Sequence, residues 1–138
     1  MQQTKNYGLN IIEPSDTFNA DALNDNAKTL EAALARLDAA VVRFACGSYT
    51  GDGKNARFFE LGFTPKMVYV GNEDGAVFYY YNGTNKHYHG GLALEGKPVT
   101  VSKVNLVEIV DGGFQVDTFS STSSANYNGR EYRYFAIG

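Results

Sequence analysis

The chain has 138 residues and a formal net charge of −3, with 43% hydrophobic and 20% charged residues. This length suits one domain rather than two, and the hydrophobic content is sufficient for a packed core. The acidic balance argues against nucleic-acid binding, which normally needs a basic surface. No apolar run approaches the roughly 18 residues of a membrane helix, so no membrane insertion is expected. A single cysteine excludes both an intrachain disulfide framework and a zinc site built from cysteines.

The sequence changes character near residue 42. Residues 1–41 carry three basic and six acidic side chains, whereas residues 42–138 carry nine of each. Tyr7 and Phe18 are the aromatic residues of the first part, and the other 17 lie in the second. Alanine is dense between positions 20 and 40 and sparse afterwards. We therefore predict an N-terminal arm at 1–18, a helix at 19–42 and a C-terminal β domain at 43–138.

The first 18 residues show no sustained hydrophobic period, and Gly8 and Pro14 interrupt them. We interpret them as an extended arm, a kind of segment that is loosely ordered unless something outside it holds it. Apolar residues such as Leu9 and Ile11 favour docking on a neighbouring chain or a larger assembly. The opening residues have no apolar core, so no secretory signal is expected.

Residues 19–42 carry the strongest helix signal, with Asn19 as a candidate N-cap and Asp21 in the first turn. The apolar positions are spaced by 4, 3, 4, 3 and 4 residues, which is the a/d pattern of a coiled coil. This seam consists of Leu23, Ala27, Leu30, Leu34, Leu37 and Val41. It spans fewer than three heptads, so self-association requires the following domain to share the contact. The alternative is a helix that packs against its own domain.

Residues 43–138 are typical of β structure. Asp-Gly or Asn-Gly pairs, which suit tight hairpins, begin at positions 52, 74, 82, 111 and 128. Runs rich in β-branched and aromatic residues lie between them, at 42–49, 57–61, 66–70, 76–81, 87–94, 99–102, 105–110, 114–118 and 131–137. Short strands with regular turns indicate a mainly β fold, an antiparallel β-sandwich preceded by one coiled-coil-like helix. The small polar stretch 120–125 is interpreted as an exposed loop.

Several stretches together resemble a known group of proteins. They are Thr4-Lys5-Asn6-Tyr7-Gly8-Leu9-Asn10, Glu13-Pro14, Asn24-Asp25-Asn26, Gly47-Ser48-Tyr49-Thr50-Gly51-Asp52-Gly53, Leu61-Gly62-Phe63-Thr64-Pro65-Lys66, Gly112-Gly113-Phe114-Gln115-Val116 and Tyr132-Arg133-Tyr134-Phe135-Ala136-Ile137-Gly138. In this order they resemble short tail-fibre and receptor-binding proteins of phages and prophages of Gram-positive bacteria. The resemblance implies a homotrimeric tail appendage that recognises a bacterial surface, but it supplies no ligand-binding residues. The chain departs from the long fibres because it has no extended shaft.

No catalytic motif is found, so we expect no enzymatic activity and no cofactor. A glycosidase needs two carboxylates across a cleft, and Asp52, Asp74 and Asp111 lie at separate turns. Cys46 falls within an alternating strand pattern and is interpreted as a small core residue rather than a nucleophile. Since no base is evident beside it, no nucleophilic role is proposed.

His87 and His89 form a weak candidate metal site. Residues two apart on a strand point the same way, and imidazole is a good ligand for transition metals. Fibre tips of the resembling proteins use such pairs around a three-fold axis. Lys86 would place a positive charge beside the ion, so our main interpretation is a polar strand face with two solvated histidines and no metal.

Aromatic and amide side chains mark the candidate ligand site. Consecutive strand residues alternate faces, so at least one of three adjacent tyrosines points away from the core. Phenol rings and amides suit sugar recognition. The candidates are Tyr79, Tyr80, Tyr81, Asn82 and Asn85, with Tyr127 in a second position. The alternative is that the outward tyrosines only fill a subunit interface.

The sequence therefore predicts a phage or prophage tail-fibre-like protein that attaches to a bacterial surface glycan without enzymatic activity. Its expected partners are two further copies of itself, a host cell-surface glycan, and other tail proteins that bind the arm. It would be made in the host cytoplasm and reside in the virion tail. Two alternatives remain: a structural tail connector that binds only protein, and a bacterial lectin with no phage role.

Overall fold

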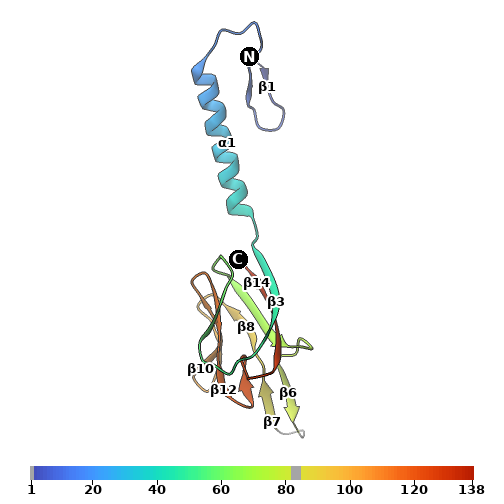
Figure 1. Ribbon diagram of the computed structural model, residues 1–138. Helices are drawn as coiled ribbons and strands as arrows, with labels where there is room; N and C mark the ends of the chain where they lie inside the picture. The colour runs from blue at the N-terminus through green and yellow to red at the C-terminus, as the bar shows by residue number, and fades with distance from the viewer. Residues whose placement is uncertain (1, 82–84) are drawn as a thin grey trace. The chain divides into compact units, whose positions relative to one another are not determined.

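The computed structural model describes residues 2–81 and 85–138 (Figure 1). The described fold is mainly β, with antiparallel sheets and one helix. The chain forms two compact units, Met1–Val41 and Val42–Gly138. Over the described residues, no helix is both long and apolar enough to cross a bilayer.

Helix α1 spans Ala20–Ala40 and makes up most of the first unit. Its sequence is rich in Ala and Leu, which favour helices. The Asn19 side chain accepts a hydrogen bond from the Asp21 backbone N–H at 2.9 Å, so Asn19 is the N-cap, as predicted. Val41 is the C-cap: its backbone is extended, which ends the helix after Ala40, and its N–H donates to the Leu37 carbonyl at 3.0 Å.

The segment before the helix is a hairpin rather than a simple extended arm. Strands β1 (Gln2–Gln3) and β2 (Asn10–Ile11) pair in an antiparallel arrangement. The Asn10 backbone N–H donates to Asn26 Oδ1 at 2.6 Å, and Asn26 Nδ2 donates to the Asn10 carbonyl at 2.9 Å. This reciprocal pair of hydrogen bonds joins the hairpin to α1. The hydrophobic pattern of residues 1–18 did not predict this contact, because two polar residues make it.

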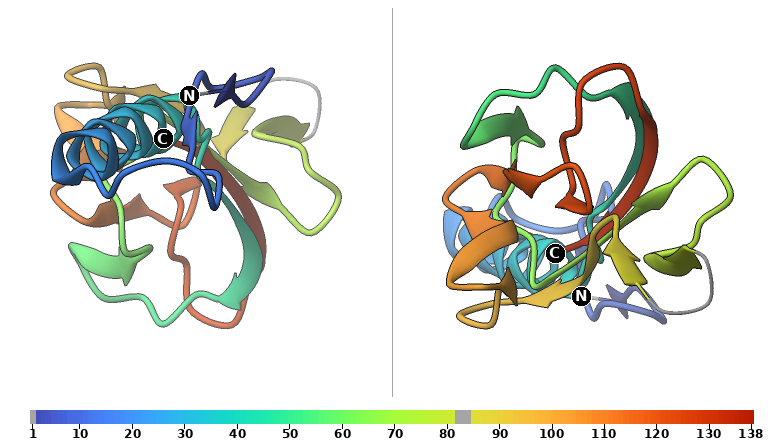
Figure 2. Two further views of the ribbon diagram at one scale, coloured as in Figure 1. Left: turned by 90° about the horizontal axis from the view of Figure 1, so that it is seen from above. Right: turned by 90° about the horizontal axis from the view of Figure 1, so that it is seen from below.

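The second unit contains three four-stranded sheets. The first, in spatial order, consists of β3 (Phe44–Thr50), β14 (Glu131–Ile137), β5 (Met67–Asn72) and β8 (Gly91–Leu94). The second consists of β4 (Arg57–Glu60), β11 (Gly113–Val116), β10 (Val104–Val110) and β9 (Val99–Val101). The third consists of β12 (Thr118–Ser120), β13 (Ser123–Ser124), β7 (Asn85–Tyr88) and β6 (Phe78–Tyr81). All pairings are antiparallel except that of β13 with β7. Figure 2 shows β3 and β14 side by side along one side of this unit.

Aromatic rings from the first two sheets meet in one core. The Phe59 ring stacks on Phe114 at 5.0 Å between centroids and lies 4.5 Å from Tyr49. Phe114 lies 5.1 Å from Tyr134, which belongs to the last strand. Eleven buried apolar side chains form the cluster around these rings. The turn at Gly112, whose φ is 76°, precedes Phe114 and Val116, and both of these side chains are fully buried.

Three sequence expectations for this unit are wrong. The run at 87–94 is not one strand, because Gly90 and Gly91 adopt φ of 135° and 150° and divide it between two sheets. The stretch 120–125 is not an exposed loop throughout, because Ser123, Ser124 and Ala125 are buried. Their small side chains fit where a larger residue would not, and Ser124 Oγ pairs with Thr118 Oγ1 at 2.9 Å.

Cys46 is the third correction, because it is exposed rather than a core residue. On β3 the inward side chains are those of the neighbouring positions, Ala45 and Tyr49 among them. The alternation of β3 was recognised correctly, but the buried face is the other one. Apolar residues occupy both faces of this strand, so the sequence pattern could not identify the core side.

Candidate functional site

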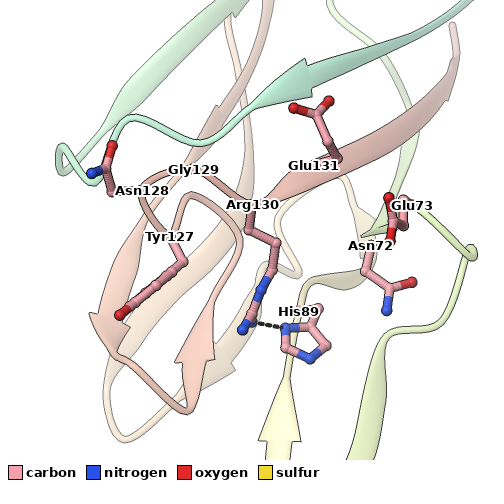
Figure 3. A pocket seen from close by; sticks show the side chains of 8 residues that line it. All are labelled: Asn72, Glu73, His89, Tyr127, Asn128, Gly129, Arg130 and Glu131. Atoms are coloured by element: carbon pink, nitrogen blue, oxygen red, sulfur yellow. Dashed lines mark hydrogen bonds between the residues drawn. The ribbon is translucent and has the colours of Figure 1, made fainter.

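A hollow of about 450 Å³ opens on the second unit and is lined by mostly polar side chains (Figure 3). Three chain segments that are distant in sequence form it: the β5–β6 turn, the β7–β8 connection and the segment that leads into β14. The lining residues are Asn72, Glu73, His89, Tyr127, Asn128, Gly129, Arg130 and Glu131. It combines an aromatic ring, two amides, two carboxylates and one guanidinium in a single depression.

Two buried tyrosines hold the segment that carries Tyr127. The Tyr132 hydroxyl accepts a hydrogen bond from the Tyr127 backbone N–H at 3.0 Å and donates to the Ser124 carbonyl at 3.2 Å. The Tyr49 hydroxyl donates to the Ala125 carbonyl, and burial raises the pKa of Tyr49. Since both hydroxyls donate to backbone carbonyls of residues 124 and 125, they fix the backbone path that leads into the hollow.

Asn126 anchors the same segment from its other side. Its amide Nδ2 donates to Asp52 Oδ1 at 2.6 Å and to the Lys54 carbonyl at 2.8 Å. Hydrogen bonds from the Lys54 backbone N–H and from Asn126 lower the pKa of Asp52. Asn126 is fully buried, so it serves the fold and is not a surface neighbour that helps Tyr127 bind a ligand.

Close backbone packing completes the support. A Cβ atom added to Gly51 would lie 2.1 Å from the Tyr127 carbonyl oxygen, so only glycine fits there. The Gly51 N–H donates to the Arg130 carbonyl at 2.8 Å, and the Gly129 N–H donates to the Gly51 carbonyl at 2.9 Å. The loop from 127 to 130 is therefore held by Gly51, which directly follows β3, and is preorganised before any ligand arrives.

Arg130 extends between Tyr127 and His89 in Figure 3. Its NH1 donates to His89 Nδ1 at 2.6 Å, and its guanidinium carbon lies 5.2 Å from the centre of the Tyr127 ring. A guanidinium cannot accept a hydrogen bond, so His89 Nδ1 is the acceptor and the neutral ring carries its proton on Nε2. Burial, then the charges of Arg130 and His87, lower the pKa of His89 to about 4. At neutral pH, therefore, Arg130 is positively charged and His89 beside it is neutral.

The outer rim offers polar groups for hydrogen bonding. Asn72 Oδ1 accepts from the backbone N–H groups of Asp74 and Ala76, which fixes the turn and leaves its amide nitrogen at the hollow. Across the described residues, 2–81 and 85–138, the side chains of Glu73 and Asn128 make no hydrogen bond or ion pair. Glu131 accepts from Thr50 Oγ1, and in Figure 3 it points away from the Arg130 guanidinium.

The structure brings only some of the predicted site residues together. Tyr127 and His89 line the hollow. Four other candidates lie on the β6–β7 hairpin: Tyr79, Tyr80, Tyr81 and Asn85. In the strand register, Tyr79 pairs with His87, Tyr80 with Lys86, and Tyr81 with Asn85. Asn82 lies outside the described residues.

The two histidines do not form a solvated pair on one strand. His89 lies beyond the end of β7 and is 1% exposed, with Arg130 at its Nδ1. The expected polar strand face is therefore wrong for His89, because β7 ends at Tyr88 and the backbone N–H of His89 instead donates to the Val77 carbonyl at 2.6 Å. No group of three or more metal-binding side chains occurs in the part of the chain that the structure describes.

Sequence reasoning missed Asn72, Glu73, Asn128 and Arg130. Two of these precede the turn at Asp74-Gly75 and two flank Gly129, so the turn signals marked their neighbourhoods. No local pattern showed that the two turns meet. Comparisons with protein-family models, with curated proteins and with solved structures found no match for this chain.

Proposed function

We propose that this chain is a tail-fibre-like protein of a phage or prophage that attaches, without enzymatic activity, to a glycan on a bacterial surface. The observation that carries the proposal is the preorganised hollow at Tyr127, with its guanidinium, amides and carboxylates. Sugar hydroxyls both donate and accept, so a site that holds both kinds of partner beside an aromatic ring suits them. An open depression of this kind suits one or two sugar units of a repeating polymer.

The finer architecture belongs to the same proposal. We infer that the first two sheets form an antiparallel β-sandwich, because their aromatic rings meet in one core. We also infer that α1 is a coiled-coil segment of a homotrimer. Its seam residues are exposed in the single chain, with Leu30 at 46%, Leu34 at 61% and Leu37 at 62%. Three hollows in one trimer would raise a weak single-site affinity through multivalency.

Binding of the full chain to an array of bacterial cell-wall glycans tests the proposal. We expect binding to at least one glycan, and Tyr127→Ala should weaken it roughly tenfold if the ring packs on a sugar. Tyr7→Ala is the matched control, because Tyr7 is an exposed tyrosine of the first unit. Retained binding in Tyr127→Ala and loss in Tyr80→Ala would move the site to the β6–β7 hairpin.

The absence of hydrolysis is tested separately. Of the two carboxylates that line the hollow, Glu131 accepts a hydrogen bond from Thr50, whereas a glycosidase needs both carboxylates free to act about the scissile bond. Purified walls incubated with the protein should release no reducing sugar. Release that disappears in Glu73→Gln would contradict this part of the proposal.

A structural connector that binds only protein is the second candidate. It is favoured by the exposed aromatic side chains of the first unit, Tyr7 at 63% and Phe18 at 75%. A glycan array without any binding, together with capture of another tail protein by residues 1–41, would support it. A bacterial lectin with no phage role would use the same hollow, and the neighbouring genes would distinguish it.

A further inference from the structure

The outward face of the first sheet carries two complete rows of apolar side chains. Strand register places Phe44, Ile137, Met67 and Leu94 side by side in one row. It places Cys46, Phe135, Tyr69 and Leu92 in the next. We call these eight residues the apolar sheet face. The following row contains Ser48, Arg133 and Gly71, so the apolar character ends there.

This face is distinct from the core. The inward residues of the same strands, such as Val68, Val70 and Ala136, are fully buried against the second sheet. On the outward side, Phe44 is 59% exposed, Leu92 53% and Leu94 41%. Met67, Tyr69, Phe135 and Ile137 are half-buried by one another. A soluble domain seldom leaves two such rows uncovered unless they contact something.

The chain connection indicates what covers the face. Val41 is the last residue of the α1 seam, and Phe44 follows it by three residues, which span at most about 10 Å. In a parallel coiled coil the Val41 side chains of all copies meet near the common axis. Phe44 of each copy then lies within about 10 Å of its own Val41, so the first apolar row begins within reach of the other copies.

The available area agrees with a shared interface. From the exposed fractions and side-chain sizes, the face presents on the order of 400 Å² of apolar surface. A stable interface uses roughly 800 Å² per partner, so the sheet face supplies about half of what is needed. The exposed α1 seam supplies apolar surface for the remainder, and neither part is sufficient alone.

We propose that the apolar sheet face is covered by other copies of this chain, so that β3, β14, β5 and β8 form the β-domain part of the oligomer interface. The inference rests on the self-association in the proposed function, and it adds the surface and the residues. Cys46 lies within the second row and is the chain's one cysteine, so its thiol reports directly on whether the face is covered.

The experiment measures the mass by light scattering and the rate at which a maleimide labels Cys46, both on the full chain. The wild type should have the mass of a trimer. Its Cys46 should be labelled at least about tenfold more slowly than Cys46 of Leu30→Asp/Leu37→Asp, because a covered thiol is inaccessible. Leu92→Asp/Leu94→Asp should weaken association roughly 100-fold or more, because carboxylates would be buried in an apolar contact. Phe58→Asp/Phe119→Asp is the matched control, since both residues are exposed and lie on other sheets. It should keep the trimer mass.

Three outcomes overturn the inference. A trimer in which Cys46 reacts as fast as in the dissociated variant shows that the face is open. A monomer with a slow Cys46 shows that the chain's own α1 covers it. A monomer with a fast Cys46 shows that nothing does. Glycan binding measured on the same samples separates the two proposals, because a monomer that still binds glycan retains the proposed function without this interface. The Cys46 rate needs no substitution in the face, so a misfolded variant leaves the test intact.

Discussion

The two units of this chain differ in where their apolar surface lies. The described residues of the second unit bury eleven apolar side chains in one cluster, whereas Ala22 is the buried apolar residue of the described segment 2–41. The first unit is instead held together by polar contacts such as the reciprocal Asn10–Asn26 pair. In proteins, most of a helix's stability comes from packing of its apolar face, and the apolar face of α1 is exposed in the single chain. The β domain therefore has an apolar core of its own, and the proposed trimer is what would cover the apolar side of α1.

The largest expected effect comes from the α1 seam. Leu30→Asp/Leu37→Asp should abolish the trimer, because carboxylates would replace the apolar contacts between copies. Light scattering at tens of micromolar protein should then give the mass of one chain. Ala35→Asp/Ala39→Asp, off the seam, is the control and should keep the trimer mass. If wild type itself has a monomer mass, the comparison fails, because α1 is then stable without a partner.

The next effect concerns the β core. Phe114→Ala removes a fully buried ring that contacts Phe59 and Tyr134, and should lower the free energy of unfolding by about 3–5 kcal/mol. Phe58→Ala, on the exposed side of β4, should change it by less than about 0.5 kcal/mol. Denaturant unfolding followed by near-ultraviolet circular dichroism measures both. Equal effects would mean that the core lies elsewhere.

A smaller effect is expected from His89. Its folded pKa of about 4 lies below the ordinary value of 6.5, so the unfolded chain binds a proton first as the pH falls. The stabilising contribution is complete above pH 6.5 and is lost as the pH falls toward 4. The melting temperature should therefore decrease from pH 7 to pH 5, and His89→Gln should reduce that slope.

His87→Gln is the control for this measurement. Glutamine at 89 retains an oxygen that accepts from Arg130 but cannot titrate. If the pH dependence of the melting temperature is unchanged in His89→Gln and reduced in His87→Gln, the prediction is wrong, because His87 and not His89 causes it.

The smallest effect is expected from the hairpin segment. Deletion of residues 1–18 should leave the melting temperature of the β domain within a few degrees, because that domain has its own core. Differential scanning calorimetry of the truncated and full chains makes the comparison. A large decrease would show that the hairpin contributes to the β core.

Local patterns predicted the elements better than the site. The helix with its Asn19 cap and the turn at Gly112 follow from side-chain chemistry that acts within a few residues. The burial of Cys46 was predicted wrongly because β3 is apolar on both faces, and alternation alone does not say which face is covered. The hollow could not be predicted because Asn72 and Arg130 meet only through sheet pairing.

The β3–β14 pair has a mechanical consequence. The chain enters β3 near Phe44, which pairs with Ile137, while the hollow lies at the other end of the pair, where Glu131 pairs with Thr50. Tension between residue 42 and a molecule held in the hollow would run along roughly 20 Å of strand. Their seven residue pairs would then bear the load together in shear rather than opening one after another. The β3–β14 pair would therefore resist tension along its strands more strongly than tension across them.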